Sequence, residues 1–173
     1  MKYSKPITIF LVDDDPLFLK VLETQFKEQT EFEIKSFSTG DECLSNLWQN
    51  PRLIFLDYHL SDDKEAANNG LRVLDSIKAK NPLIEVVMLS SQSELEVAVN
   101  CMKHQALDYI IKSEGAFIRA KKTIGDLFYR NRLEKELSFY KTTSIIVLSL
   151  IGLSILSIFL LAVFFPRLMS GSL

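Results

Sequence analysis

Short runs of β-branched and aromatic residues alternate along the chain with stretches in which apolar side chains recur every three or four positions. The first pattern is typical of buried strands and the second of amphipathic helices, so their alternation predicts repeated βα units around a parallel sheet. The expected fold class is α/β, a doubly wound five-stranded parallel sheet. The five strands are predicted at Ile7–Val12, Phe32–Phe37, Leu53–Leu56, Glu85–Leu89 and Tyr109–Ile111.

Capping signals mark where the intervening helices begin. Asp15 precedes Pro16, which predicts a carboxylate N-cap followed by proline at the first helical position. Thr39 and Glu42 have capping-box spacing, as do Ser93 and Glu96, whereas polar residues 58–70 predict a loop. The apolar faces expected to be buried contain Phe18, Val21, Leu22 and Phe26, then Leu44, Leu47 and Trp48, then Leu71, Leu74 and Ile77, and finally Leu95, Val99 and Met102.

A last helix is expected to begin near Ala116 and to lead into a segment without charge. Residues 144–165 are 22 uncharged residues, which as a helix span roughly 33 Å, enough to cross a bilayer core. A buried core helix is the alternative. A domain with five helices already around its sheet has no place for a sixth that is apolar on every side, so a transmembrane helix is favoured.

Basic residues near this segment predict its orientation. Arg130, Arg132, Lys135 and Lys141 precede it and only Arg167 follows, so the N-terminal domain is expected in the cytoplasm, on a single-pass inner-membrane protein. The predicted division is a domain over 1–130, a basic juxtamembrane helical linker over 131–143, the transmembrane helix over 144–165 and a short tail over 166–173. The small residues of the segment show no GxxxG spacing, and the sequence leaves a homodimer open.

Charge and cysteine content narrow the classes of partner. Residues 1–116 carry 19 acidic and 12 basic side chains. An acidic domain argues against nucleic acid as a direct partner, because neutralising phosphates requires a basic face. Cys43 and Cys101 have neither CxxC spacing nor partnering histidines, so they are interpreted as reduced, buried thiols, and His104 is assigned no role.

Residues that can carry chemistry follow the ends of the predicted strands. Asp13 and Asp14 follow the first strand, Asp57 the third, Ser90 the fourth and Lys112 the fifth. Ligands bind beyond the carboxyl ends of strands in such sheets, so these side chains are expected to converge. Converging acids raise one another's pKa unless a cation joins them, and Mg²⁺ prefers such oxygen ligands. A hydroxyl and an ammonium beside a carboxylate nucleophile suit phosphoryl transfer.

The order of these motifs resembles one family, the response-regulator receiver domains of bacterial two-component systems. The resemblance covers about residues 6–130 and implies a flavodoxin-like strand order of 2-1-3-4-5. Its motifs are Leu11-Val12-Asp13-Asp14, Ile54-Phe55-Leu56-Asp57, Val87-Met88-Leu89-Ser90-Ser91 and Asp108-Tyr109-Ile110-Ile111-Lys112.

The resemblance implies a role for each matched residue. Asp57 would attack the phosphohistidine of a sensor histidine kinase or phosphotransfer protein, or a small phosphodonor, in an Mg²⁺-dependent reaction. Asp14, Asp57 and the backbone carbonyl of His59 would bind the metal, with Asp13 acting through water. Lys112 and Ser90 would hold the phosphoryl oxygens. Ser90 and Tyr109 would be switch residues, and Gln92 lies where the family tunes loss of the phosphoryl group.

The sequence departs from the family pattern in two places. The family glycine is expected eight residues after the phosphoacceptor, whereas Gly70 lies thirteen residues after Asp57 and Ser61 stands near the position of a usual proline. This implies a five-residue acidic insertion in the 58–70 loop. Ser113 follows Lys112 where the family commonly has a proline in a cis bond, which leaves the geometry of that bond open.

Two other functions fit parts of the pattern. The domain could be a membrane scaffold that is never phosphorylated, although the complete set of acids, hydroxyl and lysine argues against this. A small phosphatase resembling the haloacid dehalogenase family would use Asp13 and Asp15 as nucleophile and acid, but Pro16 departs from that motif and favours Asp15 as an N-cap. The favoured interpretation is a phosphoacceptor that signals by protein contact to an unknown downstream protein, without a separate output enzyme domain.

Overall fold

Five parallel strands form one sheet in the order β2-β1-β3-β4-β5, as the resemblance implied. This computed structural model describes residues 6–27, 32–60, 69–91, 93 and 95–169. The strands are β1 (Ile7–Val12), β2 (Phe32–Phe37), β3 (Leu53–Asp57), β4 (Glu85–Ser90) and β5 (Asp108–Ile111). The helices are α1 (Pro16–Lys27), α2 (Gly40–Asn46), the 3-10 helix η1 (Leu47–Gln49), α3 (Asn69–Lys80), α4 (Leu95–Lys103) and α5 (Ala116–Met169).

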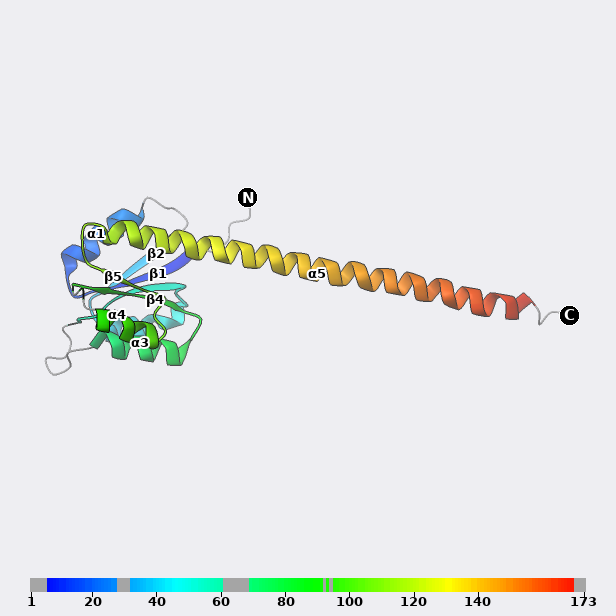
Figure 1. The fold of residues 1–173 in the computed structure, drawn as a ribbon, viewed down its shortest axis with the longest axis horizontal. Helices are drawn as coiled ribbons and strands as arrows, with labels where there is room; N and C mark the ends of the chain where they lie inside the picture. The colour runs from blue at the N-terminus through cyan, green and yellow to red at the C-terminus, as the bar shows by residue number, and fades with distance from the viewer. Residues whose placement is uncertain (1–5, 28–31, 61–68, 92, 94, 170–173) are drawn as a thin grey trace. The chain divides into compact units, whose positions relative to one another are not determined.

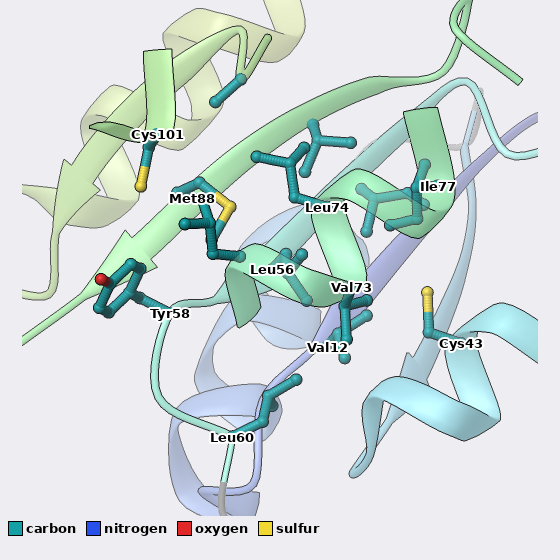
Figure 2. Packing of buried hydrophobic residues seen from close by; sticks show 14 of the residues in the cluster. Val12, Cys43, Leu56, Tyr58, Leu60, Val73, Leu74, Ile77, Met88 and Cys101 are labelled. Carbon is teal, nitrogen blue, oxygen red and sulfur yellow. The ribbon is translucent and has the colours of Figure 1, made fainter. Parts of the chain in front are cut away.

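Helices cover both faces of the sheet, with α1 and the first turns of α5 on one face and α3 and α4 on the other (Figure 1). The alternation of side chains along each strand fills both interfaces. On the first face, the Phe26 ring of α1 lies 5.6 Å from the Phe55 ring of β3. On the second, Val12, Leu56 and Met88 belong to the same buried cluster as Leu74 and Ile77 of α3 (Figure 2).

The predicted caps of the first two helices are present. The Asp15 carboxylate accepts hydrogen bonds from the backbone N–H groups of Leu17 and Phe18 at 2.9 and 3.2 Å, so Asp15 is the N-cap of α1. Thr39 Oγ1 accepts from the Glu42 N–H at 3.1 Å, and the Glu42 carboxylate accepts from the Ser38 N–H. The glutamate therefore bonds one residue before the N-cap, which still satisfies an unpaired donor at the helix start.

The predicted core face was wrong for α4 and for one residue each of two other predicted faces, whereas Leu44 and Leu47 pack against the core as predicted. Trp48 is 80% exposed, because α2 ends at Asn46 and the following 3-10 turn directs this side chain to solvent. In α4, Leu95, Val99 and Met102 are exposed, and Val97, Ala98 and Cys101 make the contacts with the core instead. Val21 of α1 is also exposed, whereas Leu19, Leu22 and Phe26 are buried.

The chain divides into two units, Met1–Ile124 and Gly125–Leu173. Ala116, Ala120 and Ile124, four residues apart along α5, are buried within the first unit. The second unit contains Phe139–Leu160, 22 residues that are long and apolar enough to cross a membrane. No residue of Phe139–Leu160 is buried, in contrast to what is expected of a core helix. This stretch overlaps the predicted segment 144–165, whose last side chains lie outside the described ones.

Candidate functional site

Three carboxylates meet at the carboxyl edge of the sheet, as the strand ends predict. Asp13 and Asp14 follow β1 and Asp57 ends β3, and one oxygen of each lies within 4.8 Å of the others. Asp13 and Asp57 are buried whereas Asp14 is exposed. The Asp15 N–H donates to Asp13 Oδ1 at 3.0 Å, which fixes the orientation of the Asp13 carboxylate. The cluster thus has two buried acids and one acid open to solvent.

Lys112 joins the two buried acids. Its Nζ lies 2.7 Å from Asp13 Oδ2 and 2.9 Å from Asp57 Oδ2. The backbone N–H of Lys112 donates to the carbonyl oxygen of Ser90 at 2.7 Å, which anchors the residue at the end of β5. Asp13 Oδ2 has no directed hydrogen bond among the described residues, so the ion pair with Lys112 is what compensates its burial.

Burial and mutual repulsion change the protonation of these groups. Burial and then the charge of Asp13 raise the pKa of Asp57 to about 6, despite the opposing effect of Lys112. Burial likewise raises the pKa of Asp13 above its usual value. Burial alone would lower the pKa of Lys112, but its contacts with Asp13 and Asp57 outweigh that effect and raise it. One ammonium therefore does not fully compensate two buried carboxylates.

The donor set fits a divalent cation. The three clustered groups are carboxylates, the hard oxygen ligands that Mg²⁺ prefers, and the exposed Asp14 leaves one side open for water or phosphate oxygens. The raised pKa of Asp57 also indicates negative charge that a cation would stabilise. The site could hold Mg²⁺ between Asp13, Asp14 and Asp57.

The remaining predicted site residues lie around this cluster. Ser90 is fully buried at the end of β4, and Tyr109 is buried in β5 among the cluster that contains Met88. The backbone N–H of His59 bonds to the Asp57 carboxylate, so His59 lies beside the phosphoacceptor candidate. Its Nε2 is buried and has no hydrogen-bond partner among the residues that the structure describes. The Lys112–Ser113 bond is trans. Gln92 and the acidic residues of 61–68 lie outside the described residues.

Gly70 is held against the backbone of the phosphoacceptor strand. Its N–H donates to the Tyr58 carbonyl oxygen at 3.2 Å. A Cβ on Gly70 would come within 2.2 Å of the Asp57 carbonyl oxygen and 2.8 Å of the Tyr58 Cα, too close for any other residue. Gly70 thus occupies a position where α3 begins next to Asp57, although it lies thirteen residues after it.

One residue at the site was missed from the sequence. The ring of Phe18 lies 4.9 Å from Lys112 Nζ, in a cation–π contact that holds the ammonium from the side of α1. The periodicity placed Phe18 correctly on the inner side of α1 but only as a core residue. The sequence offered one signal for this role: Phe18 lies in the first helical turn after the acidic pair, which places it near the carboxyl edge of the sheet.

Comparison with known proteins identifies the family of the domain that carries these residues. The model of the family described as the response regulator receiver domain matches residues 9–118. The transcriptional regulatory protein MalR of Bacillus subtilis is 26% identical over 141 residues, covering 76% of this chain and 57% of MalR. The nitrogen assimilation regulatory protein NtrX of Azorhizobium caulinodans is 33% identical over 105 residues, covering 60% of this chain and 22% of NtrX. The chain therefore matches only part of the length of these relatives.

Solved structures share the fold. The signal receiver domain of a LuxO repressor protein from Vibrio parahaemolyticus superposes with a TM-score of 0.66 at 24% identity, over 76% of this chain and 97% of that domain. NtrX from Brucella abortus gives a TM-score of 0.65 at 28% identity, over 76% of this chain and 29% of that one. With its acidic cluster and lysine at the sheet edge, the chain belongs to the response regulator receiver domain family.

Proposed function

We propose that Asp57 accepts a phosphoryl group from a phosphohistidine of a sensor kinase or phosphotransfer protein, or from a small phosphodonor. The observation that carries this proposal is the placement of Asp57 between a second buried acid and a lysine, with Lys112 Nζ 2.9 Å from Asp57 Oδ2. In the transfer, an oxygen of Asp57 forms a bond to phosphorus while the P–N bond to the donor imidazole breaks. The imidazole leaves with the electron pair of that bond.

The residues of this chain position the reactants and balance their charge. Asp13, Asp14, Asp57 and the backbone carbonyl of His59 would hold Mg²⁺, which supplies neutralisation of the phosphoryl oxygens. Lys112 is close enough to Asp57 to exchange one contact with the carboxylate for a contact with a phosphoryl oxygen. Ser90, buried at the end of the adjacent strand, would donate to another, and Tyr109 would respond to that movement.

The same chain is proposed to be anchored in a membrane by its C-terminal helix, with the receiver domain in the cytoplasm. Phe139–Leu160 has the length and composition of a membrane span. The bases Arg130, Arg132, Lys135 and Lys141 before the segment favour a cytoplasmic N-terminal side. Anchoring would raise the effective concentration of the receiver toward membrane-bound kinases and downstream proteins.

The phosphatase alternative has lost support. It requires Asp15 as a free acid, whereas the Asp15 carboxylate caps α1 through two backbone N–H groups. The alternative of a scaffold that is never phosphorylated is tested by measuring phosphorylation directly. The proposed output is a protein contact made by the receiver, with no separate enzymatic step.

Incorporation of label from acetyl phosphate tests the phosphoacceptor. The full chain in detergent should take up label when Mg²⁺ is present and lose uptake with a chelator, and mass spectrometry should place the modification on Asp57. Asp57→Asn should abolish uptake, while Asp41→Asn, an exposed acid in the first turn of α2, should leave it unchanged. Uptake that survives Asp57→Asn would refute the assignment, and no uptake by the wild type would favour the scaffold.

A further inference from the structure

Two large apolar side chains are exposed at the edge of the sheet opposite the acidic cluster. Trp48 in η1, before β3, is 80% exposed, and Leu83 in the turn before β4 is 74% exposed. The two connections lie side by side, because the Asn81 amide donates to Asn50 Oδ1 at 3.5 Å and the Glu85 N–H donates to the Arg52 carbonyl at 3.2 Å. Both strands begin here, so this is the amino edge of the sheet, far from the chemistry at the carboxyl edge.

The chain also leaves the receiver toward this edge. Helix α5 follows β5 at the carboxyl edge, and Ala116, Ala120 and Ile124 pack it along the sheet. Arg119 lies 3.2 Å from Asp108, the first residue of β5, which shows that α5 runs back along the strand toward its amino end. The last residue of the first unit, Ile124, is thus directed toward the edge that carries Trp48.

The connection to the candidate span is short. Residues 125–138 separate the first unit from Phe139, and as a helix they rise about 21 Å. A connection of this length keeps the receiver near the membrane surface when the span is inserted.

The chemistry of the edge suits a lipid headgroup region. A tryptophan ring has an apolar body and a polar N–H, which is why tryptophan concentrates at membrane–water interfaces. Arg52, just before β3, and Lys80, the last residue of α3, are both exposed near these connections and would attract anionic headgroups. We infer that Trp48 and Leu83 insert into the headgroup region of the membrane that holds the anchor, so that the amino edge of the receiver lies on the bilayer while the carboxyl edge stays open to the cytoplasm.

The inference rests on the proposed anchor, and the composition of the chain offers a clean probe. Trp48 is the only tryptophan in the sequence, and the candidate span contains none, so tryptophan fluorescence reports this edge alone. The full chain is reconstituted in vesicles of phosphatidylcholine and phosphatidylglycerol, with or without lipids brominated near the headgroup. The expected result is a blue-shifted emission relative to detergent and a loss of intensity with the brominated lipids.

Matched variants separate the amino edge from other exposed positions. Leu17 at the start of α1 is 77% exposed at the carboxyl edge. The double variant Trp48→Phe, Leu17→Trp should therefore show no loss of intensity with brominated lipids. Leu83→Glu places a charge on the same edge of the sheet and should reduce the quenching of Trp48. Uptake of label from acetyl phosphate, unchanged in each variant, checks that the fold persists.

Two results would overturn the inference in distinguishable ways. Carbonate extraction first establishes whether the chain is an integral membrane protein. If carbonate releases it, the anchor fails and the inference fails with it. If the chain is retained but Trp48 is quenched no more than the tryptophan at position 17, the anchor stands and the membrane contact is wrong, and the exposed edge then serves a protein partner.

Discussion

Gly70 approaches Asp57 so closely that a methyl group on Gly70 would lie 2.2 Å from the Asp57 carbonyl oxygen. The contact joins the start of α3 to the backbone of the strand that presents the phosphoacceptor. It accounts for a glycine at this position even though the loop before it is longer than the family pattern. The position of Asp57 is therefore set both by β3 and by the helix that follows.

Substitution of Gly70 by alanine tests this contact. Because the clash is with backbone atoms, Gly70→Ala should lower the free energy of unfolding by about 1–3 kcal/mol and slow uptake of label at Asp57. Urea denaturation in detergent measures the first effect. Gly125→Ala, at a position with free space, should be neutral or stabilising by up to about 1 kcal/mol. Equal effects of the two substitutions would contradict the close approach.

Lys112 is predicted to be the main compensation for the two buried acids. Lys112→Met should lower the free energy of unfolding by about 3–5 kcal/mol at neutral pH without metal, because two buried carboxylates lose their shared cation. The loss should shrink at acidic pH, where the acids are protonated. Lys80→Met, at an exposed lysine, should change stability by less than about 0.5 kcal/mol. A Lys112→Met effect no larger than this would refute the prediction.

The raised pKa of Asp57 predicts how metal-free stability depends on pH. The folded state holds the Asp57 proton up to a pKa of about 6, whereas the unfolded chain loses it near 3.8. Stability is therefore lost as pH rises between these values, by about 3 kcal/mol for a difference of two pKa units. In a chelator, Asp57→Asn should be more stable than wild type at pH 7 and similar to it below pH 4, as measured by urea denaturation.

Magnesium should reverse that loss. If the acids bind Mg²⁺, wild type at pH 7 should gain about 2.7 kcal/mol at a metal concentration one hundred times the dissociation constant. Asp57→Asn should gain less, because one ligand is lost. A stability that does not respond to Mg²⁺ in the millimolar range would show that the cluster is not a metal site.

The two thiols are predicted to be unreactive in the native protein. Both are free and fully buried, and burial raises the pKa of Cys43 to about 12 and that of Cys101 to about 11. Only the thiolate reacts, so a thiol reagent at pH 8 should modify neither residue until urea unfolds the domain. Ser45→Cys, at an exposed position of α2, is the positive control. Rapid native modification of the wild type would contradict the packing.

The sequence by itself determined the strands and the acids and lysine of the site. Strand positions follow from short apolar runs, and residues at the ends of parallel strands must share one edge, so Asp13, Asp57 and Lys112 could be brought together without coordinates. Asp15 and Thr39 were predictable as caps because capping depends on neighbours within one turn.

Only the tertiary structure decided which apolar stripe of a short helix is buried. It also decided whether a single side chain, such as that of Trp48 or Phe18, faces solvent or a distant residue. Leu95, Val99 and Met102 form as regular a stripe as Val97, Ala98 and Cys101, and only the docking of α4 on the sheet selects the second. Trp48 is exposed because α2 ends at Asn46 and the 3-10 turn that follows, Leu47–Gln49, directs its side chain to solvent. The Phe18 contact with Lys112 and the approach of Gly70 to Asp57 join residues distant in sequence, and such distances follow from packing rather than from periodicity.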